Sequence, residues 1–77
     1  MNWQERIIVD PEICHGKASV KGTRVMVSVI LDNLASGETA EAIAAAYHLS
    51  PEDIQAALLY AAELAKERFV PLEVGAG

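Results

Sequence analysis

The apolar pattern at the start of the chain is that of β-structure. Residues 6–9, Arg-Ile-Ile-Val, form a β-branched run that ends at the turn signal Asp10–Pro11, which predicts a strand. Gly16 and Gly22 then enclose a second β-prone segment, and glycine readily adopts the positive φ angles that tight turns need. We therefore expect a small hairpin or looped ribbon over residues 6–26, with the turn residues Gly16, Gly22 and Thr23.

The apolar period changes to that of a helix at Val27. From there apolar residues recur at the i, i+3, i+4, i+7 and i+8 positions until a glycine at position 37, which predicts a helix with one buried face. Thr39 is a suitable N-cap for a second, short helix. Its expected inward positions are Ile43, Ala44 and Tyr47.

The strongest helix start is the segment Ser50-Pro51-Glu52-Asp53. It offers an N-cap serine, a proline at the first helical position and two acidic residues in the first turn, so we expect a helix over residues 51–69. The apolar residues of this helix fill an arc of about 160°, whereas contact with one core needs roughly 100°. The part of the apolar arc beyond 100° predicts that this helix also packs against a second surface.

Residues 40–58 also fit a helix-turn-helix, with Leu49 as the hydrophobic turn residue. In that arrangement the second helix can lie in the major groove of DNA. Glu52 and Asp53 at its exposed start would repel phosphates, and Gln55 is its only obvious reader of bases. We therefore expect the helix-turn-helix topology without major-groove reading by this helix.

The size and composition of the chain predict self-association. Seventy-seven residues form one domain at most, and 52% of them are hydrophobic while only 5% are aromatic. A chain this short buries a smaller share of its surface than a larger one does. We expect a mostly α, dimeric domain with a small N-terminal β element, and the interface residues Ile7, Val9, Ala57, Ala61, Leu64 and Ala65.

The charge balance restricts the choice of partners. Six basic residues stand against eleven acidic ones, which gives a net charge of −5, and binding to a phosphate backbone needs concentrated positive charge. The positive residues that do cluster are Lys17, Lys21 and Arg24. They form either a local anion-binding or nucleic-acid-binding patch or a solvated turn, and we expect Arg24 to order the β element through carbonyls or a carboxylate.

Neither a catalytic site nor a cofactor site is expected. Cys14-His15 lacks the further groups that a nucleophile or a zinc site requires, and a turn-capping Asp10 beside a solvated Glu12 needs no catalytic role. The single cysteine, the lack of a run of eighteen apolar residues and the lack of a secretion signal predict a cytoplasmic protein without membrane contact.

Residues 8–27 resemble the opening of the domain of unknown function 433 family. The family pattern is a Gly-Lys-Pro-x-x-x-Gly-Thr-Arg-aliphatic-x-Val string after an Asp-Pro turn, and this chain matches it at Gly16-Lys17 and at residues 22–27. Ala18 stands where the family has proline. An Ile-Leu-x-x-Leu-Ala-x-Gly helix at residues 30–37 extends the resemblance, which covers about residues 6–72.

The resemblance implies a homeodomain-like helical domain that acts as a predicted antitoxin. Its expected partner is a PIN-like ribonuclease toxin, and autoregulation through operator DNA is a second expected role. The alternatives are a DNA-binding repressor without a toxin and a scaffold subunit. We expect one domain over residues 1–77, with β element and loops at 6–26, a helical core at 27–69 and a tail at 70–77. Expected toxin contacts are Phe69, Val70, Leu72 and Val74.

Overall fold

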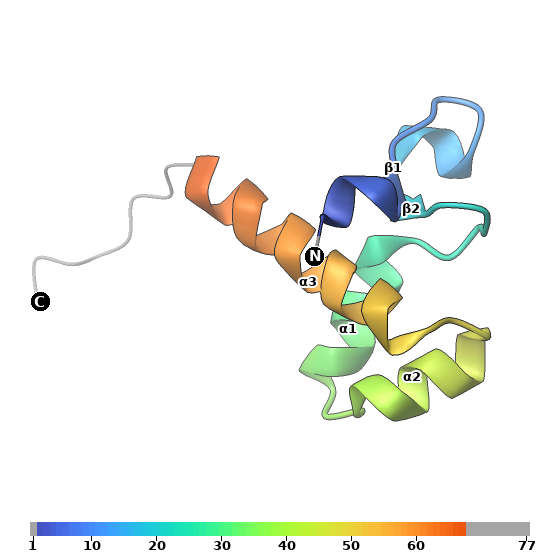
Figure 1. The fold of residues 1–77 in the computed structure, drawn as a ribbon, viewed down its shortest axis with the longest axis vertical. Coiled ribbons are helices and arrows are strands. Elements are labelled where there is room, and N and C mark those ends of the chain that lie inside the picture. The colour runs from blue at the N-terminus through green and yellow to red at the C-terminus, as the bar shows by residue number, and fades with distance from the viewer. Residues whose placement is uncertain (1, 68–77) are drawn as a thin grey trace, which may run out of the picture.

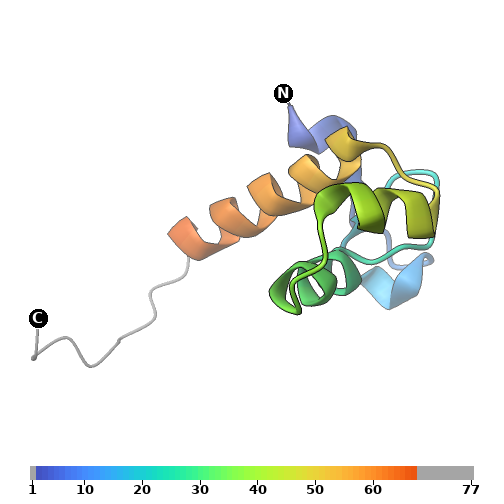
Figure 2. The ribbon, with the colours of Figure 1, turned by 90° about the horizontal axis from the view of Figure 1, so that it is seen from below.

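The computed structural model describes residues 2–67 and is mostly helical (Figures 1 and 2). Three α-helices, α1 (Val27–Ala35), α2 (Ala40–Tyr47) and α3 (Pro51–Glu67), follow a short two-stranded sheet. Within these residues no helix has both the length and the apolarity needed to cross a membrane. The expected mostly α fold with a small N-terminal β element is confirmed.

The sheet consists of two very short antiparallel strands. β1 (Ile7–Ile8) pairs with β2 (Ser19–Val20), so that Ile7 lies opposite Val20. The backbone N–H of Lys21 extends this pairing by donating to the Arg6 carbonyl at 2.7 Å. The predicted strand over residues 6–9 is therefore shorter than expected, and Val9 beyond it is 55% exposed.

A tight turn at Gly22 and Thr23 links β2 to the start of α1. Gly22 has a φ of +82°, as expected for a turn glycine. The Thr23 hydroxyl donates to the Val20 carbonyl at 2.8 Å and accepts from the Val25 N–H at 3.0 Å. The turn is therefore held by its own side chain, which fixes the direction in which the chain enters α1.

A left-handed single turn precedes β2. The short helix η2 (Cys14–Gly16) contains three consecutive residues with positive φ, namely Cys14 at +52°, His15 at +56° and Gly16 at +81°. Two of them carry side chains, for which this conformation is uncommon. The Asp10 carboxylate supports the approach to this turn by accepting from the Glu12 N–H at 2.9 Å.

Each of the two later helices begins at the cap that the sequence indicates. The Thr39 hydroxyl accepts from the Ala42 N–H at 3.1 Å at the start of α2. At the start of α3, the Ser50 hydroxyl accepts from the Asp53 N–H at 3.3 Å while the Asp53 carboxylate accepts from the Ser50 N–H at 3.0 Å. This reciprocal pair is a capping box. Between the two helices, His48 ends α2 in the left-handed conformation.

The buried core joins the β element to all three helices. Its largest fully buried apolar side chains are Ile30 on α1, Ile43 on α2 and Ile54 on α3. Ile7 is 6% exposed and Ala57 is fully buried in this same core. Both were expected at a dimer interface, and this placement corrects that expectation, because a side chain packed inside its own chain has no surface left for another.

The second half of α3 extends beyond the body of the molecule (Figures 1 and 2). At the point where it leaves, Tyr60 packs edge-on against Trp3 of the short N-terminal helix η1 (Trp3–Glu5), with ring centroids 5.2 Å apart. The residues after Tyr60 include the exposed Leu64. The apolar face of α3 therefore continues past the part that the core covers.

Replacing Gly22 by alanine should destabilise the fold through the backbone alone. A Cβ at this position meets no atom within 4 Å, so the cost comes from the positive φ and should be about 1 kcal/mol in the free energy of unfolding. Urea unfolding measures this cost. Gly22→Asn is the control, because asparagine tolerates the left-handed region, and an equal loss in both variants would contradict the explanation.

Candidate functional site

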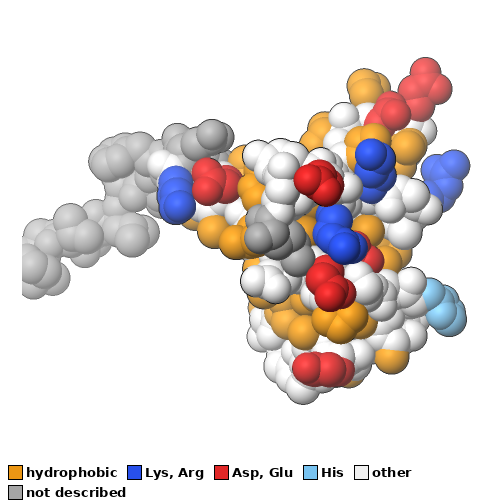
Figure 3. Space-filling model, in the orientation of Figure 1, with side chains coloured by type: hydrophobic (Ala, Val, Ile, Leu, Met, Phe, Trp, Pro, Cys, Tyr) orange, Lys and Arg blue, Asp and Glu red, His pale blue; other side chains and the backbone are white. Residues whose placement is uncertain are grey.

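The cluster of basic residues was the sequence's main candidate for an anion or nucleic-acid site. The structure places all three side chains on the surface but in three different hollows. Lys17 borders a groove between α1 and α3, Lys21 a hollow beside Glu5 and Asp53, and Arg24 a shallow hollow at Gly22. Figure 3 shows basic side chains on this face as separate patches among acidic ones. The three residues are close in sequence, but they do not line one common surface hollow.

Arg24 does not order the β element. Within residues 2–67 its guanidinium makes neither a hydrogen bond nor an ion pair, and the Arg24 contact in this region is made by its carbonyl, which accepts from the Cys14 Sγ at 3.4 Å. The ordering role expected for Arg24 therefore belongs to other side chains. The guanidinium itself is exposed and available to a ligand.

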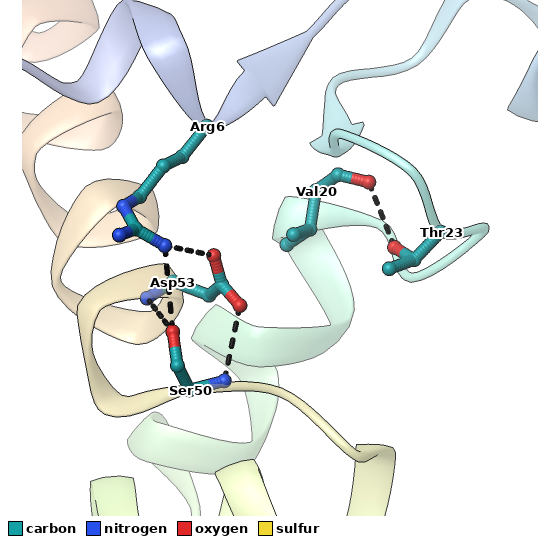
Figure 4. A network of polar contacts seen from close by, with 5 residues as sticks. All are labelled: Arg6, Val20, Thr23, Ser50 and Asp53. Carbon is teal, nitrogen blue, oxygen red and sulfur yellow. Dashed lines mark hydrogen bonds and ion pairs between the residues drawn. The ribbon is translucent and has the colours of Figure 1, made fainter.

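Arg6 has the ordering role instead, and the sequence analysis missed it. Its Nη1 lies 3.0 Å from the Asp53 Oδ1 and 3.4 Å from the Ser50 Oγ, across 47 and 44 positions of sequence respectively (Figure 4). These bonds join the residue before β1 to the capping box of α3. The available signal was a lone arginine next to an apolar strand together with a Ser-x-x-Asp start that leaves one carboxylate oxygen for a partner.

The electrostatics of this contact keep Asp53 ionised. Partial burial alone would raise the pKa of Asp53, but the backbone N–H of Ser50, the Arg6 guanidinium and the Ser50 hydroxyl together hold that pKa below its usual value. Both carboxylate oxygens are engaged, one by Arg6 and the other by the Ser50 N–H. The positive end of α3 is thus already occupied by an internal anion.

The exposed start of α3 presents little to DNA. Glu52 and Gln55 are both exposed, so one acidic side chain and one amide make up the polar surface there. Cys14 is half-buried and His15 is exposed. Within residues 2–67, no three His, Cys, Asp or Glu side chains gather closely enough to hold a metal ion.

Large apolar side chains are a more prominent surface feature. Leu58 and Leu64 of α3 are 46% and 38% exposed, and Val9 and Tyr47 are exposed elsewhere. Among the other expected interface residues, Ala65 is exposed and Ala61 is half-buried. The expected toxin contacts Phe69, Val70, Leu72 and Val74 lie outside the described residues.

Of these exposed apolar side chains, Leu64 lines a groove between α1 and α3. The groove has a volume of about 590 Å³. Its lining is mainly aliphatic and aromatic, with one charged residue at the edge. The lining residues are Lys17, Ala18, Val27, Ser28, Leu31, Tyr60, Ala61 and Leu64.

A double-mutant cycle on Arg6→Met and Asp53→Asn should show that the two side chains are coupled. Arg6 is partly exposed and Asp53 less so, so we expect a coupling of about 1 kcal/mol, above that of a fully exposed pair. Chemical unfolding of the wild type, both single variants and the double variant measures it. Strictly additive effects would mean that the contact contributes nothing.

The same carboxylate should make stability depend on acid. The pKa of Asp53 is lower in the folded chain than in the unfolded one, so the unfolded state takes up the proton first, and the stabilisation is present at neutral pH and lost as the pH falls below about 4. Asp53→Asn should therefore lose its disadvantage relative to the wild type at low pH. Urea unfolding between pH 3 and 7 tests this, with Glu52→Gln as the control for an exposed acid in the same turn.

Comparison with known proteins shows what this arrangement is similar to. Among solved structures, the crystal structure of Rv2018 from Mycobacterium tuberculosis matches with a TM-score of 0.62 and 31% sequence identity. That match covers 68% of this chain and 24% of the Rv2018 chain, so this chain spans about a quarter of its length. No curated protein matches. Residues 7–61 match the family model described as "Protein of unknown function (DUF433)", and the chain therefore belongs to the DUF433 family.

Proposed function

We propose that this chain is a non-catalytic, antitoxin-like binding module that acts as a homodimer and neutralises a PIN-like ribonuclease toxin. The single observation that carries the protein-binding part is the distribution of surface chemistry. Leu58 and Leu64 stand exposed on α3, whereas Lys17, Lys21 and Arg24 border three separate hollows. Exposed apolar groups beside a groove are typical of a protein-binding surface.

The net charge favours a basic partner. The chain carries a charge of −5, and the part of a ribonuclease that holds RNA is positively charged because its substrate is a polyanion. An acidic protein is steered towards such a surface and is opposed by RNA itself. Occupation of the nuclease by the chain is thus a physically reasonable way to neutralise it.

Operator binding through a helix-turn-helix is the second candidate function. We infer a helix-turn-helix from the short connection between α2 and α3, in which His48 adopts the left-handed conformation and Leu49 is half-buried. Lys17, Lys21 and the exposed Arg24 guanidinium would supply the phosphate contacts. Against strong binding stand the engaged Asp53 and the exposed Glu52 at the start of α3.

Co-purification with the ribonuclease encoded beside this chain's gene tests the first proposal. We expect a stable complex and a loss of ribonuclease activity on an RNA substrate at a 1:1 ratio of chains. Phe69→Ser combined with Leu72→Ser in the full chain should weaken the complex if the C-terminal residues capture the toxin. A gene neighbourhood without a PIN-like reading frame, or full ribonuclease activity in the mixture, would count against the proposal.

A charge-reversal variant separates DNA binding from toxin binding. Lys21→Glu and Arg24→Glu together should abolish any retention of the chain's own upstream DNA at 150 mM salt, since each phosphate contact contributes to a salt-dependent affinity. The same variant should still neutralise the ribonuclease. Lys66→Glu is a control for the reversal of one exposed charge outside this group, because the Lys66 side chain is 73% exposed. Nanomolar operator binding by the isolated wild-type chain would instead favour the repressor function.

A further inference from the structure

The far half of α3 forms a ridge between two hollows. Tyr60 and Leu64 are four positions apart, so they stand in one row along the helix surface. One side of the row faces the groove towards α1, and the other faces a second hollow of about 370 Å³ that is bordered by Trp3, Gln4 and Glu63. Both hollows are lined by Tyr60 and Leu64.

We propose that this surface is occupied by a second copy of the chain, whose own Tyr60–Leu64 ridge lies in the groove between α1 and α3. A two-fold interface requires one surface that carries both the projecting and the receiving shape, because the same patch meets itself. The ridge and the groove lie side by side here and share Tyr60 and Leu64. The inference deepens the dimer in the proposed function and rests on that part of it alone.

The amount of surface also favours a reciprocal arrangement. Residues 58–67 of α3 span about 15 Å, and two helices touching over that length alone would fall short of the roughly 1,200 Å² that a stable interface buries. When each ridge lies in the groove of the other copy, the interface contains two ridge-and-groove contacts instead of one. This arrangement also adds the α1 wall, to which the half-buried Leu31 contributes.

Size and charge are compatible with this packing. Ala61 in the groove permits close approach of a helix, and the groove is bordered by the positive Lys17 rather than by an acid. The acidic Glu63 of α3 lies 3.5 Å from Lys66 of its own helix. The α3 helix of a second copy can therefore enter the groove without bringing two acidic side chains together there. In the view of Figure 3, hydrophobic side chains follow the edge of α3 next to its basic and acidic ones.

Sedimentation equilibrium of Leu64→Glu and of Val9→Glu tests this assignment. Both positions are exposed aliphatic residues, but Val9 belongs to the rival surface at the end of β1. We expect Leu64→Glu to weaken the dimer about 100-fold, as for a central interface residue, and Val9→Glu to leave it unchanged. A monomeric wild type, a dimeric Leu64→Glu or a monomeric Val9→Glu would each overturn the proposal.

Two further measurements guard against simpler explanations. Leu64→Glu mixed with Leu64→Lys should restore a heterodimer, because the two-fold axis brings both positions into one interface, and a misfolded variant would not be rescued. The double variant Phe69→Ser with Leu72→Ser should leave the dimer intact. Loss of the dimer in this variant would mean that the C-terminal residues, and not the Tyr60–Leu64 ridge, occupy the groove. If the Leu64→Glu variant is monomeric but still inhibits the ribonuclease, the dimer surface and the toxin-binding surface are different. If the wild type is a dimer but binds no toxin, the proposed function fails and the assignment of the dimer surface still holds.

Discussion

The contact of Arg6 with Asp53 and Ser50 is the interaction on which the arrangement of this small molecule depends. The β element and the three helices are each built from local hydrogen bonds, and neither two-residue strand has enough pairing to stand alone. The ionised contact ties the residue before β1 to the first turn of α3. It does so at the point where Ile7 enters the core beside Ile54 and Ala57. One arginine therefore ties the start of the strand to the capping box of α3.

The same contact decides what the surface can do. Because Asp53 is engaged on both oxygens, the positive end of α3 is not open to a phosphate, and Lys21 lies beside an acidic pair rather than beside the other two basic residues. The apolar part of α3 beyond the body offers a different kind of surface to partners. There, aliphatic side chains lie next to the charged Glu63 and Lys66, and such a mixed surface is suited to protein contacts.

Local features were predictable from the sequence, and long-range ones were not. The caps at Thr39 and Ser50 and the positive φ of Gly22 follow from the chemistry of single residues and their neighbours. The wide apolar arc of α3 was also visible, but periodicity does not say which part of the arc faces the chain's own core, so Ala57 was assigned to the wrong surface. The Arg6–Asp53 pair spans 47 positions. Arg24 shared its charge and lay closer to glycines, which made it the more conspicuous candidate.

The large sequence separation of that pair has a consequence for how the molecule folds. The three helices pack through connections of a few residues, so their contacts lose little chain entropy on forming, whereas docking of the β element closes a loop of more than forty residues. We therefore expect the helices to form first and the N-terminal segment to dock last. By the same argument we expect the N-terminal segment to open first under native conditions, so that its backbone amides exchange with solvent before those of the buried Ile30 and Ile54. Rapid amide exchange in this segment would then report local opening rather than loss of the helical core.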